Sequence, residues 1–431
     1  MKIRKFASAI MVIAMISALT SCTSSPNVSS GATTSVSNTT ASNTQPVTIT
    51  FWHNYDESAG QIDVLNQLIT QFENDNPGIK VNQLYLEWSA LKNNVIAGAT
   101  TKMLPDVLRG DIAFVPQFQS LNVLVEMSSL PDYSSLAAKL LDAPNSTAKM
   151  GDKFYGVAAD TNTKILFYNK DLLTKAGLSV PTTLDEMWNS AAKLSGSGKY
   201  GFVEAWTGIW NVGPYIWSSG GDVLSKDYST ATGYINGPIT VSVIQKLADL
   251  YKAKQLTGPT LDPGAAGDTD GWAAGTYAME VDGPWRAVYC DQAKINYGAA
   301  ILPAGSKGSI SVLGGEDFMM FQTSDDAHKA ASWKFIQFMD SKDAQVAMAK
   351  VGQMPVNKEA LTDQTAIQAI PLLPVFSQAL QTARPRPVIP QWSDIEDVIA
   401  TKVNEAITGV KPVQQAMDEA ADAVNAILAK K

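Results

Sequence analysis

Hydrophobic positions in the chain alternate between strand-like and helix-like spacing after residue 46. Residues 47–52 are β-branched and aromatic, which is typical of a strand, and the polar-apolar pattern then takes a helical period until Pro77-Gly78. A second strand over 79–84, a helix from about Ser89 and a short strand around 106–108 follow. This βαβαβ order predicts a parallel sheet with helices on its faces. The apolar positions of the first predicted helix are Ile62, Leu65, Leu68, Ile69 and Phe72.

The same alternation continues further along the chain. Residues 154–168 have an extended pattern, and Thr183 with Glu186 forms a capping box that opens an amphipathic helix ending at Leu194. Further strands are expected at 200–203 and 277–281, and the last hundred residues are chiefly helical in pattern. The part of the chain from residue 47 onward has some 385 residues. This is too long for one hydrophobic core, so two or more α/β lobes are expected.

The N-terminus has the pattern of an export signal. Lys2, Arg4 and Lys5 precede an uncharged apolar run that ends at Leu19, and this run is shorter than the ~20 residues a spanning helix needs. The run closes with Leu-Thr-Ser-Cys at 19–22, which resembles a bacterial lipobox. Residues 1–21 are therefore predicted to be a lipoprotein signal peptide, and Cys22 is predicted to carry the lipid.

Residues 22–46 are predicted to be the lipidated cysteine and a disordered tether. The stretch after Cys22 consists of Ser, Thr, Asn, Gly, Ala, Pro, Val and Gln, with no charge and no aromatic residue. Such a segment buries too little apolar surface to offset the entropy of ordering it. As a flexible coil it would hold the folded part roughly 25–30 Å from its anchor.

Composition excludes several classes of function. The net charge is −8, and it becomes −11 once the three positive residues of the signal peptide are removed, which argues against a nucleic-acid partner. Only two cysteines and two histidines are present, and none forms a cluster with metal-ligand spacing. Phosphate-binding loops, nucleophile elbows and kinase motifs are absent from the sequence. We therefore expect no metal, no cofactor and no catalytic residue.

Tryptophan supplies the main chemical signal. The chain has ten, and Trp206, Trp210 and Trp217 lie close together in one segment, while Trp285 follows an Asp-Gly-Pro turn. An aromatic face packs against the apolar face of a pyranose, and nearby carboxylates and amides take its hydroxyls. Each tryptophan taken alone is better explained by core packing, except Trp285, where the preceding turn favours a functional role.

Five segments, in the same order, resemble the extracellular solute-binding proteins of family 1, which include the maltose- and trehalose-binding proteins of ABC importers. The longest match is GDKFYGVAADTNTKILFYNKDLLTKAGLSVPTTLDEMW, where the chain of such proteins crosses from one lobe to the other. Together they extend over nearly the whole chain after the tether. The five segments are residues 47–81, 105–127, 151–188, 273–286 and 329–361.

The resemblance implies a two-lobed α/β fold of the periplasmic-binding-protein type II, with the ligand in a cleft between lobes joined by a hinge of several crossings. The N-terminal lobe would comprise 47–157 and 314–362, and the C-terminal lobe 158–313 and 363–431. The implied function is an extracytoplasmic sugar receptor, monomeric and lipid-anchored to the cell membrane, that delivers a mono- or oligosaccharide to the permease of an ABC transporter.

The resemblance also implies which residues touch the ligand. Arg384 competes with Arg386 for the arginine that closes the site, and Asn162 stands where relatives often have aspartate. The implied ligand residues are Asn54, Glu57, Glu87, Trp88, Asp111, Asp160, Asn162, Trp206, Trp217, Trp285, Gly315, Glu316 and Arg386.

Two other classes of function stay open at the level of sequence. A glycoside hydrolase would place two carboxylates about 5–9 Å apart around the bond it cleaves, and Asp111 and Asp160 are the candidates. A receptor for a charged solute, such as a glycerol phosphoester or a polyamine, is the other. A phosphoester calls for clustered basic residues, which the candidate loops largely lack, and a polyamine leaves Arg386 unexplained.

Overall fold

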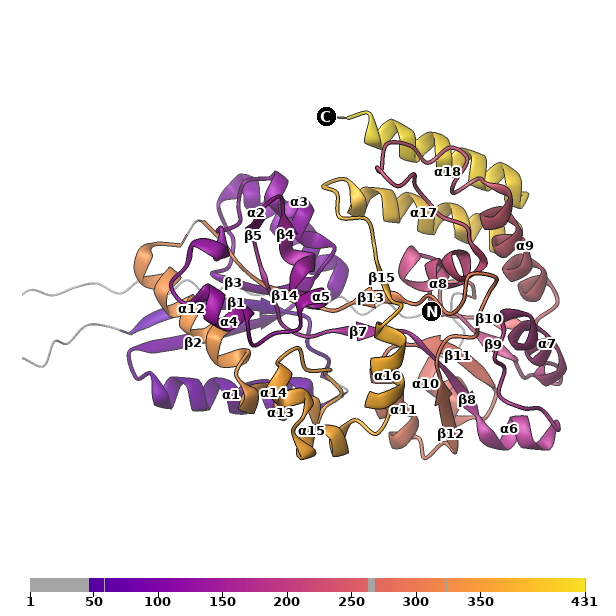
Figure 1. The fold of residues 1–431 in the computed structure, drawn as a ribbon, viewed down its shortest axis with the longest axis horizontal. Helices are drawn as coiled ribbons and strands as arrows, with labels where there is room; N and C mark the ends of the chain where they lie inside the picture. Colours follow the sequence, from indigo (N-terminus) through magenta and orange to yellow (C-terminus); the bar gives the residue numbers. More distant parts are fainter. Residues whose placement is uncertain (1–45, 58, 263–267, 323, 431) are drawn as a thin grey trace, which may run out of the picture. The chain divides into compact units, whose positions relative to one another are not determined.

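The computed structural model describes residues 46–430, apart from 58, 263–267 and 323, and its ribbon is drawn in Figure 1. The predicted signal peptide, Cys22 and most of the predicted tether lie outside the described residues. The described residues belong to one compact unit. None of the helices in this part of the chain is both long enough and apolar enough to cross a membrane.

The first sheet has five strands in the order β2-β1-β3-β14-β6. Strand β1 pairs in parallel with both β2 and β3, so the parallel sheet predicted from the βαβαβ pattern is confirmed. Strand β14 comes from much later in the chain and lies antiparallel between β3 and β6. The strands are β1 Val47–His53, β2 Ile79–Tyr85, β3 Val107–Asp111, β6 Val157–Ala158 and β14 Glu316–Met320.

Helices cover both faces of the first sheet. On one face, Leu65, Leu68 and Phe72 of α1 pack with β1 and with α12 and α13, as the helical period of that segment predicted. On the other face, α2 and α3 form a separate cluster with Leu108 of β3. The helices are α1 Gln61–Asp75, α2 Trp88–Thr101, α3 Phe114–Ser120, α12 Asp326–Met339 and α13 Lys342–Ala349.

A second five-stranded sheet has the order β10-β9-β11-β8-β12. Its β8 runs antiparallel to both β11 and β12, whereas β9 pairs in parallel with β10 and β11. The strands predicted at 200–203 and 277–281 are β9 and β11, shifted towards their C-terminal ends. The strands are β8 Ile165–Asn169, β9 Phe202–Val203, β10 Leu256–Thr257, β11 Met279–Asp282 and β12 Tyr297–Ala300.

The largest apolar core packs helices on one face of the second sheet. Helix α7 begins with the predicted capping box, in which the side chains of Thr183 and Glu186 each accept a hydrogen bond from the backbone N–H of the other residue. A smaller core on the opposite face includes Trp272, Cys290 and Phe376 from α10, α11 and α16. The helices are α7 Leu184–Leu194, α8 Ile209–Ser219, α9 Pro238–Lys252, α10 Asp268–Ala273, α11 Trp285–Gln292, α16 Leu373–Leu380, α17 Trp392–Ile407 and α18 Val413–Leu428.

Three short strands lie between the two sheets and form a sheet of their own, in the order β15-β13-β7 (Figure 1). Each belongs to a segment that connects to elements of the large sheets. Two of these strands lie close to the lobe boundaries expected at 157/158 and 313/314, while the third lies at Arg384–Pro385, beyond the boundary expected at 362/363. The exact lobe boundaries given above stay a prediction. The strands are β7 Asn162–Thr163, β13 Val312–Gly314 and β15 Arg384–Pro385.

The remaining elements are short. Strands β4 and β5 form an antiparallel pair, and α14 and α15 connect α13 to α16. The elements are η1 Met127–Ser129, α4 Tyr133–Ala137, α5 Asp142–Asn145, η2 Ser146–Ala148, β4 Lys149–Met150, β5 Lys153–Phe154, α6 Lys170–Lys175, α14 Lys358–Leu361 and α15 Gln364–Ala369.

Asp340 is a buried carboxyl without a cationic partner among the described residues. Its side chain is fully buried, one oxygen accepts from Gln345 at 3.3 Å, and Oδ2 has no hydrogen-bond partner in that part of the chain. Burial raises the pKa of Asp340 well above its usual value, and the negative charges of Asp160 and Asp317 raise it further. The folded protein therefore holds this proton at pH values where the unfolded chain has lost it.

Asp340→Asn is expected to stabilise the protein more at pH 8 than at pH 4. A carboxyl whose pKa is raised by folding costs stability as pH rises above its unfolded pKa, and asparagine removes that cost. The expected gain in the free energy of unfolding at pH 8 is about 1–3 kcal/mol, the usual cost of an unsatisfied buried group. Urea unfolding at both pH values measures it, with Asp343→Asn at an exposed position as the control. An equal effect at the two pH values would contradict the assignment.

Candidate cleft between the two sheets

A cavity of about 450 Å³ lies where loops after strands of the first sheet face α8, α11 and α17. We call it the cleft. Nine of the thirteen residues expected to touch a ligand line it. The nine are Asn54, Trp88, Asp111, Asn162, Trp206, Trp285, Gly315, Glu316 and Arg386; the other lining residues are Thr207, Gly208, Trp210, Asn211, Thr260, Gly314, Glu396, Asp397 and Ala400.

Two larger hollows, of about 560 and 650 Å³, occur at the surface around α7 and α9. Each is lined by a single aromatic side chain, Tyr234 in one and Trp188 in the other, and Trp188 is nearly buried in the core. The cleft has four tryptophans, and its lining comes from strands of the first sheet and from segments that follow β9, β10 and β11 of the second. It is therefore the better candidate for a ligand site, in spite of its smaller volume.

The aromatic side of the cleft is built from two helix N-termini. Trp285 begins α11 and Trp210 lies in the first turn of α8, and their ring centroids are 6.2 Å apart with an interplanar angle of 34°. Gly283 lies beneath the Trp285 ring, where a Cβ atom would stand only 2.3 Å from Cη2. Trp206 is 60% exposed at the edge of the cleft. These rings offer flat apolar faces beside polar groups.

An ion-paired group of side chains crosses the cleft. Arg386 donates from Nη2 to Oδ1 of Asp111 at 2.5 Å, and its Nη1 lies 3.4 Å from Oε2 of Glu396. The Arg386 guanidinium also lies 5.9 Å from the Trp210 ring. Asp111 is the last residue of β3, while Glu396 belongs to α17, so one arginine connects the first sheet to the helices of the largest core. Burial raises the pKa of Glu396, while Arg386 opposes that shift.

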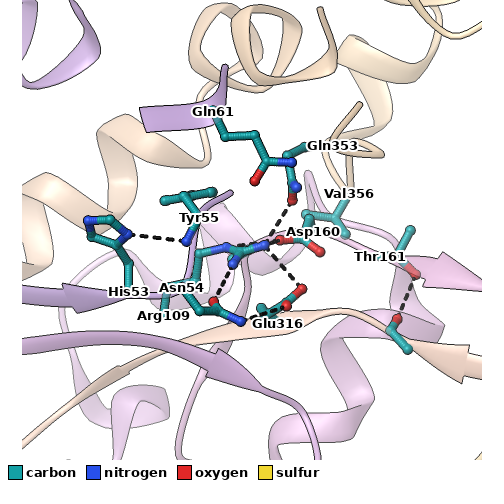
Figure 2. Close-up of polar contacts among 12 residues, drawn as sticks. His53, Asn54, Tyr55, Gln61, Arg109, Asp160, Thr161, Glu316, Gln353 and Val356 are labelled. Carbon is teal, nitrogen blue, oxygen red and sulfur yellow. Dashed lines mark hydrogen bonds and ion pairs between the residues drawn. The ribbon is translucent and has the colours of Figure 1, made fainter. Parts of the chain in front are cut away.

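Arg109 is the centre of a second ion-paired group, whose polar contacts are drawn in Figure 2. Its Nη2 lies 2.5 Å from Oδ2 of Asp160 and 3.1 Å from Oε2 of Glu316, and Nη1 donates to Oδ1 of Asn54 at 2.6 Å. The Arg109 side chain is only 2% exposed, and its guanidinium stacks 4.1 Å from the ring of Tyr55. A single buried cation therefore holds residues from three separate segments in place.

Glu316 has an unusual environment within this group. Burial raises its pKa to about 8; the Asp160 carboxylate adds to that rise, and Arg109 opposes it. Gly315 before it has φ 135°, and a Cβ there would stand 2.4 Å from the backbone oxygen of Asp160, so only glycine fits. The sharp backbone turn thus brings Glu316 to the cleft directly from β13.

A smaller pocket of about 120 Å³ adjoins the cleft and shares with it Asn54, Asn162, Trp285 and Glu316. Asp160 lines this pocket and not the cleft itself. Its carboxylate is already engaged by Arg109, so it acts first as a partner of that buried cation.

Besides Asp160, three expected ligand residues do not line the cleft. Glu57 is exposed in the loop before α1, where its backbone oxygen accepts from Gly60. Glu87 lies at the start of α2 and accepts a hydrogen bond from the Ala90 N–H at 3.4 Å. Trp217 is 2% exposed and packs in the largest core. The expectation that these side chains face the cleft is therefore corrected.

The structure separates the two candidate arginines. Arg384 pairs with Asp222 at 2.9 Å and lies 5.1 Å from the buried Trp217 ring, outside the cleft. Arg386, two residues later, lines the cleft. Arg386 lies beyond the end of β15, so the strand geometry that would place residues two apart on the same side does not apply to this pair.

Several lining residues were not expected. Trp210 was recognised as an aromatic candidate but not selected, and Asn211 and Glu396 were not considered. Arg109, which lines the smaller pocket, is also absent from the predicted ligand residues. A charged residue inside an otherwise apolar strand, Val-Leu-Arg-Gly-Asp, was the signal that could have identified Arg109, because such a charge needs a buried partner. Among the described residues, no group of three or more acidic, histidine or cysteine side chains could hold a metal ion.

A model of the bacterial extracellular solute-binding proteins matches residues 67–375, which is more than half of the chain. The chain belongs to this family. Relatives with different stated ligands match it. The sn-glycerol-3-phosphate-binding periplasmic protein of Pectobacterium atrosepticum is 25% identical over 418 residues, covering 88% of this chain and 91% of that one. A maltooligosaccharide ABC transporter solute-binding lipoprotein of Streptococcus pneumoniae (strain TIGR4) is 26% identical over 290 residues, covering 65% and 67%.

Among solved structures, the solute-binding protein resembles maltose-bound MalE3 of T. maritima. The TM-score is 0.77 at 26% identity, covering 88% of this chain and 99% of that one. The predicted two-lobed α/β fold of type II is thereby confirmed. Because the names of these relatives give different solutes, the ligand of this protein has to be inferred from its own cleft.

Proposed function

We propose that this solute-binding protein captures a neutral mono- or oligosaccharide outside the cytoplasm and delivers it to the permease of an ABC transporter. The arrangement of tryptophan faces beside Asp111, Asn162 and Glu316 in one cleft is the observation that carries the proposal, because it matches the apolar faces and hydroxyl edges of a sugar. The maltose-bound and maltooligosaccharide-binding relatives support it. The protein acts as a monomeric receptor and not as an enzyme.

The glycerol phosphoester alternative has a relative in its favour, but the charges of the cleft oppose it. Both guanidinium groups of the site are already paired: Arg109 with Asp160 and Glu316, and Arg386 with Asp111 and Glu396. A phosphate would have to displace carboxylates from them. For a glycosidase, the same pairing engages Asp111 and Asp160, the two carboxylates that would act on the bond.

A panel of solutes tests the proposal. We expect a neutral sugar from a set of maltose, maltotriose and galactooligosaccharides to raise the melting temperature, and glycerol 3-phosphate and spermidine to leave it unchanged. At 100 times its dissociation constant a ligand adds ~2.7 kcal/mol of stability. Chromatography of the recovered sugar should show it intact. A response to glycerol 3-phosphate alone, or hydrolysed sugar, would reject the proposal in favour of the corresponding alternative.

The anchor is part of the same proposal. Cys22 follows the lipobox-like residues and precedes the tether, and the Streptococcus pneumoniae relative is named a lipoprotein. Cys22→Ala should abolish incorporation of a labelled fatty acid and release the protein from the membrane fraction, because no other thiol lies near the expected cleavage site. Cys290→Ala is the matched control, since Cys290 is buried in the fold. Label retained on the Cys22→Ala protein would refute lipid anchoring at this residue.

A further inference from the structure

Three buried polar atoms of cleft residues have no hydrogen-bond partner among the described residues. They are Oδ1 of Asn162, Oδ1 of Asn211 and Nε of Arg386. All three side chains belong to residues less than a tenth exposed, at 9%, 3% and 5%. A buried polar atom without a partner is costly, and in a residue that lines a cleft a bound ligand can supply the missing partner.

Asn211 is the most constrained of the three. It lies in the first turn of α8, and its Nδ2 donates a hydrogen bond to Oε1 of Glu204. Glu204 also accepts from Nζ of Lys164 at 3.0 Å and from the hydroxyl of Tyr215 at 2.5 Å. All four side chains are buried, with exposures between 0% and 3%. The Glu204 carboxylate is therefore surrounded by three donors.

This arrangement fixes which end of the Asn211 amide faces the cleft. An asparagine amide donates from its nitrogen and accepts at its oxygen, whereas an ionised carboxylate only accepts. The amide nitrogen must therefore point to Glu204, and the oxygen is directed away from it. Burial raises the pKa of Glu204, but Lys164, Tyr215 and Asn211 all oppose that shift by bonding to the charged form.

We propose that Asn211 is a specificity-determining residue, held by the buried Lys164–Glu204–Tyr215 network so that it can only accept a hydrogen bond from the ligand. The inference rests on the proposed function and makes it narrower. The bound solute must place a donor, a sugar hydroxyl, against Asn211. A phosphate or carboxylate oxygen placed there would face the amide oxygen without a proton between them, so this position selects a hydroxyl over an anionic oxygen.

Titration calorimetry on the full chain tests this with maltose, or with whichever neutral sugar of the panel binds, and with its monodeoxy and monodeoxyfluoro derivatives. For one hydroxyl, both replacements should weaken binding to the wild type by about 3- to 10-fold, the usual effect of one hydrogen bond, because neither derivative can donate there. In Asn211→Ala the parent sugar should be weakened by the same factor, and those derivatives should bind no more weakly than the parent.

Glu204→Gln tests the positioning network. A glutamine amide can turn either end towards Asn211. The ratio of the affinities for the hydroxyl sugar and for its fluoro derivative should therefore fall towards one, which a general loss of stability would not cause. Asn425→Ala, which removes a polar network in α18 away from the cleft, is the control and should keep that preference.

The outcomes separate the two proposals. Sugar binding with unchanged affinity in Asn211→Ala would overturn this inference and leave the proposed function intact. The inference would also be overturned if no single hydroxyl replacement weakened binding to the wild type by the same factor as Asn211→Ala weakens binding of the parent sugar. The measurements on the wild type do not depend on any variant being folded. Failure of every neutral sugar to bind would overturn the proposed function, and this inference with it.

Discussion

Trp285→Ala is expected to lower the affinity for the bound sugar by roughly 30- to 1000-fold. Truncation of an aromatic residue at the centre of a binding site typically costs on the order of 2–4 kcal/mol, and each 1.4 kcal/mol corresponds to a factor of ten. Trp285 lines both the cleft and the adjoining smaller pocket, and its ring lies beside that of a second tryptophan, Trp210. A sugar in the cleft would therefore lose an apolar face at the point where the two spaces meet.

Titration calorimetry measures this effect, and Trp285→Phe is the matched variant because it keeps a flat aromatic face. We expect Trp285→Phe to lose much less affinity than Trp285→Ala. The melting temperatures of the ligand-free variants should stay close to that of the wild type, since Trp285 is only partly buried. Unchanged affinity in a folded Trp285→Ala protein would place the sugar elsewhere.

Arg109→Met is expected to lower the free energy of unfolding by about 3–5 kcal/mol at neutral pH, the usual cost of leaving buried charges without their partner. The substitution deprives Asp160 and Glu316 of a cation that lies 2.5 and 3.1 Å from them. Both buried carboxylates would then lack their cation, and the pKa of Glu316, already raised to about 8, would rise further. Their penalty grows as pH rises above the unfolded pKa, so the loss of stability should be larger at pH 8 than at pH 5.

Urea unfolding of Arg109→Met at the two pH values provides the measurement. The triple variant Arg109→Met, Asp160→Asn, Glu316→Gln is the control, because it removes the carboxylates together with their cation and should recover much of the lost stability. A loss of less than about 1 kcal/mol in the single variant would mean that the ion-paired group is not buried as described, since that is the range of exposed pairs.

Local patterns were enough to predict much of the fold. The β-branched and aromatic residues of β1, the helical period of α1 and the capping box of α7 are local signals, and the structure confirms each predicted element. The place of β14 could not be predicted in the same way from pattern alone. It joins the first sheet through hydrogen bonds to β3 and β6, which lie far away in the sequence.

The candidate site shows the same division. Trp210 and Trp217 are seven residues apart on α8, a spacing that puts both on similar sides of the helix but about 10 Å apart along its axis. Trp210 therefore reaches the cleft while Trp217 is enclosed in the core. Sequence alone does not fix how deep the helix extends into the lobe. Arg109 was missed for a related reason, since its role depends on carboxylates from two distant segments.

The position of β14 has a consequence for how the chain is made. The first sheet cannot be completed until residues 316–320 have been synthesised, because β14 lies between β3 and β6 and pairs with both. Until then β3 and β6 each have an unpaired edge. All strands of the second sheet precede β14 in the sequence, so they are synthesised before β14 can pair with β3 and β6. Pairings this distant close slowly. The nascent chain thus stays incompletely folded for most of its synthesis, which is the condition in which an exported polypeptide can still be threaded through a narrow membrane channel.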